Sequence, residues 1–166
     1  MSFVDRYVSS GRLQLADARI DEDFKQADGE PDVLVRADLV FYGVAHSRGS
    51  YEGRVFFNNP DADADTLRDR EHGYAGSYWV FGHENCYGDP GHCDPEWGAA
   101  EDVLDLRRPH HLLPETAVID VTDALRDIPG LAEGITVTVV AVRTAPSGDE
   151  SRPPLRFDHL RLLTYA

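Results

Sequence analysis

The chain has 166 residues, and its 30 acidic side chains outnumber its 16 basic ones, which gives a formal charge of −14 at pH 7. This excess of negative charge argues against nucleic acid and anionic membranes as partners, because both are bound through basic patches that neutralise phosphates. Hydrophobic residues make up 42% of the chain, which is enough for a folded core, and no apolar run approaches the roughly 20 residues of a membrane-spanning helix.

The N-terminal part differs in composition from the rest of the chain. Residues 20–32 are rich in Asp, Glu, Gly and Pro in the manner of a loop, whereas residues 12–15 could form a first strand. We therefore expect an N-terminal arm or first strand in residues 1–32 and one β-sandwich domain in residues 33–166. Residues 1–6 lack the basic start and apolar stretch of a signal peptide, which predicts a cytoplasmic protein.

Alternating or β-branched hydrophobic residues predict six strands in this domain. They are expected over residues 33–41, 51–58, 75–83, 116–121, 135–142 and 155–165. Thr122 can cap a short helix over residues 123–127, which Pro129 and Gly130 end. Short strands without a βαβ pattern predict an all-β fold, an antiparallel and jelly-roll-like sandwich of about seven strands with one short helix.

The two sheets of such a sandwich are expected to share one hydrophobic core. Alternation along residues 75–83 puts Trp79 and Phe81 on the same face of their strand. We expect this face to point inward. The predicted core therefore contains Leu39, Phe56, Trp79, Phe81, Val137 and Val139.

Residues 60–72 form an acidic loop whose aspartates have the spacing of the start of a calcium-binding loop. Asp61, Asp63 and Asp65 alternate as in an EF-hand. Thr66 stands where that loop needs glycine, and His72 stands where it needs glutamate. A solvated acidic turn is therefore the expectation.

Metal-ligating side chains gather in a long irregular segment rich in Gly and Pro. Imidazole and thiolate are the preferred ligands of zinc and copper, so this segment predicts a site for one of these ions. The expected ligands are His83, Cys86, His92, Cys93, His110 and His111. Because His110 and His111 are adjacent, their side chains point in opposite directions in an extended segment, and one of the two is expected to reach the ion.

Two carboxylates in the same segment, Glu84 and Asp94, are candidates for a catalytic base or for a group that orients a metal ligand. The ligand spacing matches no standard zinc finger. A disulfide between Cys86 and Cys93 is the alternative, with histidines that only form local hydrogen bonds. In a cytosolic chain such a cysteine pair is more often free or metal-bound than disulfide-bonded.

Several stretches of the sequence resemble a known kind of domain. The strand Tyr74–Gly82, with its Tyr-Ala-Gly-Ser start, and the strands and helix after it resemble the β-sandwich that follows the dicopper domain in molluscan haemocyanins. Residues 51–60, 91–95 and 109–112 look still more like the C-terminal domain of bacterial tyrosinase-family proteins. The resemblance covers about residues 33–145. It implies a sandwich that packs over a copper site, where it shields the entrance or blocks it until activation.

The resemblance does not extend to the dicopper oxidase itself. Type-3 copper chemistry in that family uses six histidines on a four-helix bundle, several of them at His-x-x-x-His spacing. This chain has seven histidines, no pair at that spacing and no long helix to hold them. No catalytic residue of the oxidase therefore carries over, and the chain is not expected to be a dicopper oxidase by itself.

Three functions follow from the sequence and stay open at this point. The first is a mononuclear zinc or copper enzyme that acts on a small molecule through its bound metal. The second is an accessory module that covers a separate tyrosinase-like oxidase or delivers copper to it. The third is a structural or interaction domain whose segment is closed by a Cys86–Cys93 disulfide.

Overall fold

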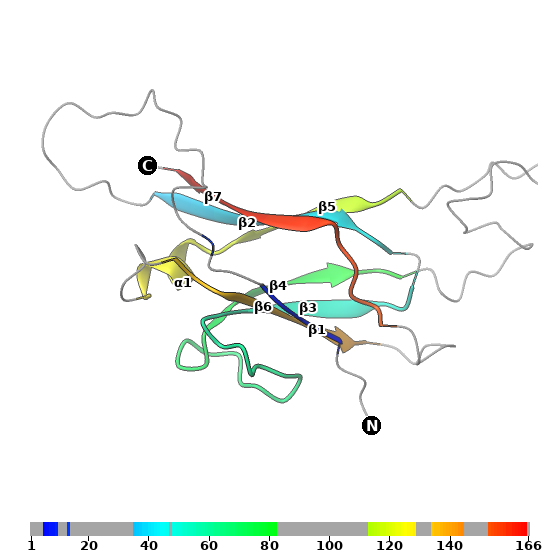
Figure 1. Cartoon of the computed structure of the whole chain (residues 1–166), viewed down its shortest axis with the longest axis horizontal. Helices are drawn as coiled ribbons and strands as arrows, with labels where there is room; N and C mark the ends of the chain where they lie inside the picture. The colour runs from blue at the N-terminus through cyan, green and yellow to red at the C-terminus, as the bar shows by residue number, and fades with distance from the viewer. Residues whose placement is uncertain are drawn as a thin grey trace, which may run out of the picture.

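The structure is a computed structural model, and it describes residues 5–9, 13, 35–46, 48–82, 113–128, 134–144 and 153–165. These residues form two antiparallel β-sheets packed face to face, with one short helix at an end of the sandwich (Figure 1). The predicted all-β sandwich is confirmed.

The elements follow one another along the chain as β1 (Asp5–Val8), β2 (Arg36–Val44), β3 (Tyr51–Phe57), β4 (Tyr74–Val80), β5 (Glu115–Asp120), α1 (Thr122–Arg126), β6 (Val137–Arg143) and β7 (His159–Tyr165). The four-stranded sheet has the order β1-β6-β3-β4, and the three-stranded sheet has the order β5-β2-β7. Each of the six strands predicted from residue 33 onward is present, with its ends shifted by a few residues.

The N-terminal part contributes a strand that the sequence did not predict. β1 pairs with β6 at the edge of the four-stranded sheet, in a register that places Arg6 opposite Val140. The strand expected over residues 12–15 is represented among the described residues by Leu13, which forms an isolated bridge to Ile135. Part of residues 1–32 therefore belongs to the sandwich.

The core between the sheets is built from alternate residues of facing strands. Leu39 and Phe41 of β2 meet Val137 and Val139 of β6, and all four side chains are fully buried. Tyr78 of β4 packs against Gly53 of the neighbouring β3 so closely that a Cβ there would lie 2.5 Å from the ring. Burial raises the pKa of the Tyr78 phenol, which therefore stays protonated.

Three of the expected core residues lie elsewhere. Trp79 is 58% exposed and Phe81 is 79% exposed, because the alternation of β4 turns Tyr78 and Val80 inward instead. The expectation that Trp79 and Phe81 fill the core was wrong. Phe56 is buried, but it packs on the outer face of the four-stranded sheet in a separate cluster with Ala62 and Val140.

Residues 58–73, which connect β3 to β4, fold back over that outer face (Figure 1). Glu52 on this face is only 2% exposed, and its carboxylate accepts hydrogen bonds from Arg54 Nε at 2.9 Å and Arg68 Nη1 at 3.0 Å. Arg54 also donates through Nη1 to the Ala64 carbonyl at 2.7 Å. The connection is therefore fixed to the sheet by an ionic cluster as well as by apolar packing. We call residues 58–73 the cover segment.

The predicted acidic turn lies within the cover segment and is confirmed. Asp63 Oδ1 accepts hydrogen bonds from the backbone N–H groups of Asp65 and Thr66 and from the Thr66 hydroxyl, at 2.9 to 3.0 Å. These bonds favour the charged carboxylate and hold the pKa of Asp63 below its ordinary value. The aspartates here organise a turn.

Candidate functional site

Every site residue predicted from the sequence lies outside the described residues. This holds for His83, Glu84, Cys86, His92, Cys93, Asp94, His110 and His111. The metal site, the two catalytic carboxylates and the alternative disulfide therefore stay predictions. Within the described ranges, no group of three or more His, Cys, Asp or Glu side chains could hold a metal ion.

The structure does place the two ends of the segment that carries these residues. The Gly82 N–H donates to the Ser50 hydroxyl oxygen at 2.9 Å, directly before the segment begins. His46 Nε2 lies 2.7 Å from the Leu113 carbonyl oxygen, directly after the segment ends. Since a carbonyl only accepts, His46 carries its proton on Nε2 in this contact. Gly82 and Leu113, which flank residues 83–112, are thus both bound to the connection between β2 and β3.

Close backbone packing fixes the first of these anchors. A Cβ added at Gly82 would lie 1.7 Å from the Arg48 carbonyl oxygen, so only glycine fits against this connection. Arg48 in turn donates through Nη1 to the carbonyl of Pro153, which precedes β7. The anchor is therefore part of a wider contact between three segments of the chain.

Large hydrophobic side chains are exposed at both ends of the His- and Cys-rich segment. Trp79 and Phe81 precede it, and Leu113, which is 70% exposed, follows it. We call these three residues the apolar rim. His46, by contrast, is largely buried, with 12% of its side chain exposed, and its Nδ1 lies 3.9 Å from the Glu115 carboxylate.

Sequence reasoning missed His46, Ser50 and Leu113, because they act through contacts with residues that are distant in the sequence. The sequence identified Phe81 and Trp79 as an aromatic pair, but the prediction placed both rings in the hydrophobic core. The sequence did carry a signal against this placement. Tyr78 and Val80 form a second hydrophobic set in the same strand, on the face opposite to Trp79, so either set could point inward.

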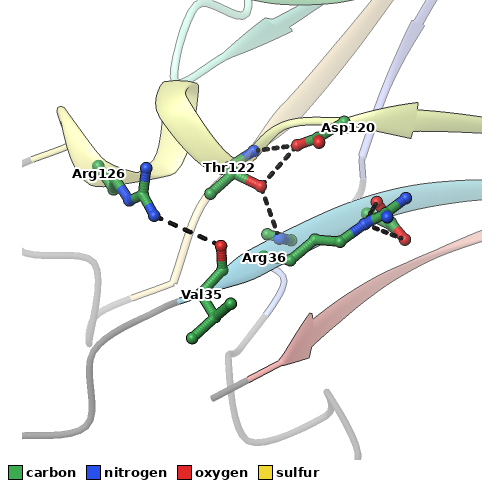
Figure 2. Close-up of polar contacts among 7 residues, drawn as sticks. Val35, Arg36, Asp120, Thr122 and Arg126 are labelled. Carbon is green, nitrogen blue, oxygen red and sulfur yellow. Dashed lines mark hydrogen bonds and ion pairs between the residues drawn. The ribbon is translucent and has the colours of Figure 1, made fainter.

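A second feature lies where α1 meets the start of β2. Thr122 links them, because its hydroxyl accepts a hydrogen bond from the Ala37 N–H at 2.9 Å (Figure 2). The Asp120 carboxylate accepts from the Thr122 N–H at 3.0 Å and from its hydroxyl at 2.5 Å. Thr122 was predicted to cap the helix, but it is the first helical residue, and Val121 is the N-cap without a side-chain hydrogen bond. The hydroxyl instead binds the start of β2, the strand that neighbours β5 in the same sheet.

An open hollow of about 480 Å³ lies beside this link. Its lining combines three arginines and two aspartates with small or apolar groups: Val35, Arg36, Arg70, Ala75, Asp120, Thr122, Asp123, Ala124 and Arg126. Arg126 spans one side, donating to Asp123 at 3.1 Å and to the Val35 carbonyl at 3.4 Å. The pKa of Asp120 lies below its ordinary value, first because of its hydrogen bonds to Thr122 and then because of the charges of Arg36 and Arg126.

No helix among the described residues is long and apolar enough to cross a membrane.

Comparison with known proteins found no matching family model and no matching curated protein. Three solved structures of a latent aurone synthase, which is a polyphenol oxidase, are similar to this chain.

The first structure is of the recombinantly expressed synthase and gives a TM-score of 0.46 and 14% sequence identity. The second is of the synthase from its natural source and gives a TM-score of 0.43 and 14% sequence identity. The third is of the recombinant synthase co-crystallised with hexatungstotellurate(VI) and gives a TM-score of 0.45 and 15% sequence identity. The alignments cover 98 to 99% of this chain and 24% of each neighbour. This chain therefore spans about a quarter of the length of the oxidase chains to which it is distantly similar.

Proposed function

We propose that this chain is an accessory domain that docks on a separate tyrosinase-like oxidase and covers its copper site or delivers copper to it. The observation that carries the proposal is the apolar rim. Its three large hydrophobic side chains are exposed in the stretches that flank residues 83–112, and Gly82 and Leu113 in these stretches bind to Ser50 and His46 of one connection. Large hydrophobic residues exposed close together mark interaction sites, and aromatic residues dominate the binding energy of many interfaces.

The sequence resemblance supports an oxidase as the partner. The stretch Tyr74–Gly82 carries that resemblance, and in the structure only its inward residues, such as Tyr78 and Val80, serve the core. Its outward residues Trp79 and Phe81 contribute little to folding while they face solvent. Docking over a copper site, which is the role that the resemblance implies, would bury these two rings and account for the whole motif.

The segment between the anchors is proposed to hold the zinc or copper ion. His83 follows the anchored Gly82 directly in the sequence, and one residue separates His111 from the anchored Leu113. Both anchors attach to the same connection, so chain connectivity favours a shared ion for histidines from the two ends of the segment. Three imidazoles with an open fourth position would suit exchange of the ion or of its ligands, and a thiolate in that position would close the site.

Docking is tested with a tyrosinase-like dicopper oxidase that lacks its own sandwich domain. We expect a saturable complex by calorimetry, weakened at least tenfold (on the order of 1.4 kcal/mol) by Trp79→Ser combined with Phe81→Ser. Tyr165→Ser removes an exposed aromatic ring from the three-stranded sheet and is the control, which should leave the affinity unchanged. Equal affinity of the double variant, or no complex with the oxidase, rejects the proposal.

The metal site is tested separately by measuring metal in protein purified without added ions. We expect near-stoichiometric zinc or copper, lost in His92→Ala together with resistance of the segment to proteolysis. His72→Ala, in the cover segment, removes an exposed histidine bound to Asp69 and should retain the metal. A metal-free protein with a Cys86–Cys93 disulfide would reject this part.

The same preparations test whether the chain is itself a metal-dependent enzyme. Glu84 and Asp94 are proposed as its catalytic carboxylates in that case. Turnover of a small molecule that requires the metal and either carboxylate, and that does not need the apolar rim, would replace the accessory role. Purified alone and loaded with copper, the chain is expected not to oxidise catechols at tyrosinase-like rates.

A further inference from the structure

We propose that β5 accepts an additional strand from a partner protein, namely an extended segment with basic residues near its two ends. β5 is an edge strand of the three-stranded sheet, and among the described strands it pairs with β2 alone. When a strand is added to a sheet edge, main-chain hydrogen bonds supply the affinity and side chains supply the specificity. Docking through the apolar rim does not use these backbone groups.

The backbone of β5 has hydrogen-bonding groups that its own sheet does not use. The Val121 N–H, directly after β5, donates to the Ala37 carbonyl of β2 at 2.8 Å. Because alternate residues of an antiparallel strand turn their N–H and C=O groups to opposite sides, Ala117 and Ile119 also face β2. The residues whose N–H and C=O groups point away from β2 are therefore Thr116, Val118 and Asp120.

β5 lacks the features that protect the other edge strands of the described sheets. Edge strands are protected by short length, by charged side chains within the strand, or by bulges and kinks. β1 has only 4 residues, β4 has a register shift beside Gly76, where φ is 149°, and β7 carries the exposed Arg161. Between its acidic ends β5 has the sequence Thr-Ala-Val-Ile, without charge, glycine or proline. This edge is therefore open to strand addition.

Val118 offers an apolar contact beside this edge. Its side chain is 54% exposed, whereas Ile119, on the opposite face of β5, is 7% exposed and belongs to the core. Gly76 of β4 lies so close behind β5 that a Cβ there would be 2.8 Å from Ile119 Cγ2. Ile119 is thus fixed from inside, while Val118 can pack against a side chain of an added strand, as β-branched neighbours do across a sheet.

The charges at the two ends of β5 favour a basic partner over a second copy of this chain. Glu115 begins the strand, and its side chain is 71% exposed. The charged groups around the other end form three ion pairs and one unpaired carboxylate: Arg36–Asp38, Arg70–Asp127, Arg126–Asp123 and Asp120. With histidine counted as neutral, each end therefore keeps one negative charge. A second copy would bring the same charges and its own −14, whereas arginine or lysine near both ends of the added strand would complement them.

The test is titration of the chain alone, without an oxidase, with a labelled peptide in which threonine and valine alternate between two terminal arginines. Fluorescence anisotropy at physiological salt should show saturable binding with a Kd of about 100 μM or tighter. A twin peptide with glutamate in place of both arginines should bind at least about tenfold more weakly. Absence of saturable binding of the arginine peptide, or equal binding of its twin, overturns the proposal. Neither result affects docking, which is tested through Trp79 and Phe81.

Amide hydrogen exchange locates the bound peptide. Exchange should slow at least about tenfold at the three N–H groups that point away from β2, because these become hydrogen-bonded. The N–H groups of Ala117 and Ile119 already face β2 and should not change. Slowing at every amide of β5, or at none, would contradict strand addition at this edge.

Variants separate the backbone contribution from that of the side chain. Val118→Pro removes an outward N–H without removing a bond to β2 and should weaken peptide binding at least about tenfold. Val118→Thr keeps the N–H and the strand propensity, and its affinity should stay within about threefold of the wild type. Val8→Pro is the control on the edge strand β1, where the Ser9 N–H binds the Val137 carbonyl and the Val8 N–H therefore points away from β6.

An equal loss of peptide binding in Val8→Pro, or wild-type affinity in Val118→Pro, would place the peptide elsewhere and overturn the site. A thermal melt verifies that each variant is folded. Sedimentation of the chain alone tests the remaining occupant, a second copy. A dimer that Val118→Pro dissociates would assign this edge to self-association and overturn the basic partner.

Discussion

The outer faces of the two sheets differ in how far they are covered. The cover segment buries Glu52 and Phe56 on the outer face of the four-stranded sheet. On the outer face of the three-stranded sheet, Val118 of β5 and Tyr165 of β7 are about half exposed, whereas Asp38 and Val40 of the central strand β2 are buried. Charges under the cover segment, such as that of Glu52, have lost water and depend on protein partners, whereas charges at exposed positions remain screened by solvent. The same kind of substitution should therefore have very different effects at covered and at exposed positions.

The largest effect is expected for Glu52→Ala on the covered face. The carboxylate neutralises Arg54, whose side chain is only 11% exposed, and also holds Arg68 of the cover segment. Its removal leaves a buried guanidinium without its ionic partner, which costs about 3–5 kcal/mol of the free energy of unfolding. Urea denaturation measures this loss.

Asp123→Ala is the matched control because it breaks an ion pair with Arg126 in which both side chains are largely exposed. Exposed pairs contribute about 0–1 kcal/mol. Equal losses in the two variants would mean that the cover segment does not exclude water from Glu52.

A second comparison uses two phenylalanines. Phe56→Ala removes a ring enclosed between the four-stranded sheet and Ala62 of the cover segment, and it should cost about 3 kcal/mol, the lower end for such a change because a connecting segment can settle into the space. Phe81→Ala removes a ring that is 79% exposed and should change stability by about 0.5 kcal/mol or less. Thermal unfolding of the two variants checks the difference. A large loss for Phe81→Ala would place that ring in a packed environment.

The sequence predicts the strands of this fold better than it predicts their faces. β6 has the β-branched run of a buried strand, and hydrophobic alternation is clear in β2. In β4 the residues on each of the two faces include large hydrophobic side chains. The alternation of the sequence therefore does not determine whether Trp79 or Tyr78 points inward. The choice is made by Gly53 of the paired strand, which leaves room for the Tyr78 ring.

The remaining errors also come from contacts between distant parts of the chain. β1 has the sequence Asp-Arg-Tyr-Val, too polar for a recognisable strand pattern, and it is held by pairing with β6 on one side. Thr122 stands in a local context suited to capping, yet its hydroxyl bonds to Ala37, which is 85 positions away. The candidate ligands were visible in the sequence as residue types, whereas the anchors that bring the ends of their segment together were not.

An intermediate effect is expected for Thr122→Val, which keeps the shape of the side chain and removes the hydroxyl. The buried Ala37 N–H then loses its acceptor, and an unsatisfied buried donor costs about 1–3 kcal/mol. Thr116→Val on β5 changes an exposed threonine and should be close to neutral. Urea denaturation of both variants is the measurement. A neutral Thr122→Val would show that water replaces the hydroxyl and that α1 is not fixed by this bond.

The smallest expected effect is a shift in the pKa of one carboxyl group, that of Asp120. The Thr122 hydroxyl is the main cause that holds the pKa of Asp120 below its ordinary value of 3.8. Because the pKa in the folded state is lowered, Asp120 contributes stability above 3.8 and loses that contribution as the pH falls through its lower folded value. In Thr122→Val the pKa of Asp120 should therefore rise toward 3.8, and the acid sensitivity due to this residue should shrink.

Asp63 provides the internal reference for this shift, since a different threonine, Thr66, lowers its pKa in the cover segment. Nuclear magnetic resonance of the carboxyl carbons follows both aspartates in one sample. We expect the titration of Asp63 to stay where it is in Thr122→Val while that of Asp120 moves upward. If both move, the substitution has loosened the whole sandwich. If neither moves, the Thr122 N–H and the arginines rather than the hydroxyl lower the pKa of Asp120, because that N–H, then Arg36 and Arg126, are the next groups that stabilise its carboxylate.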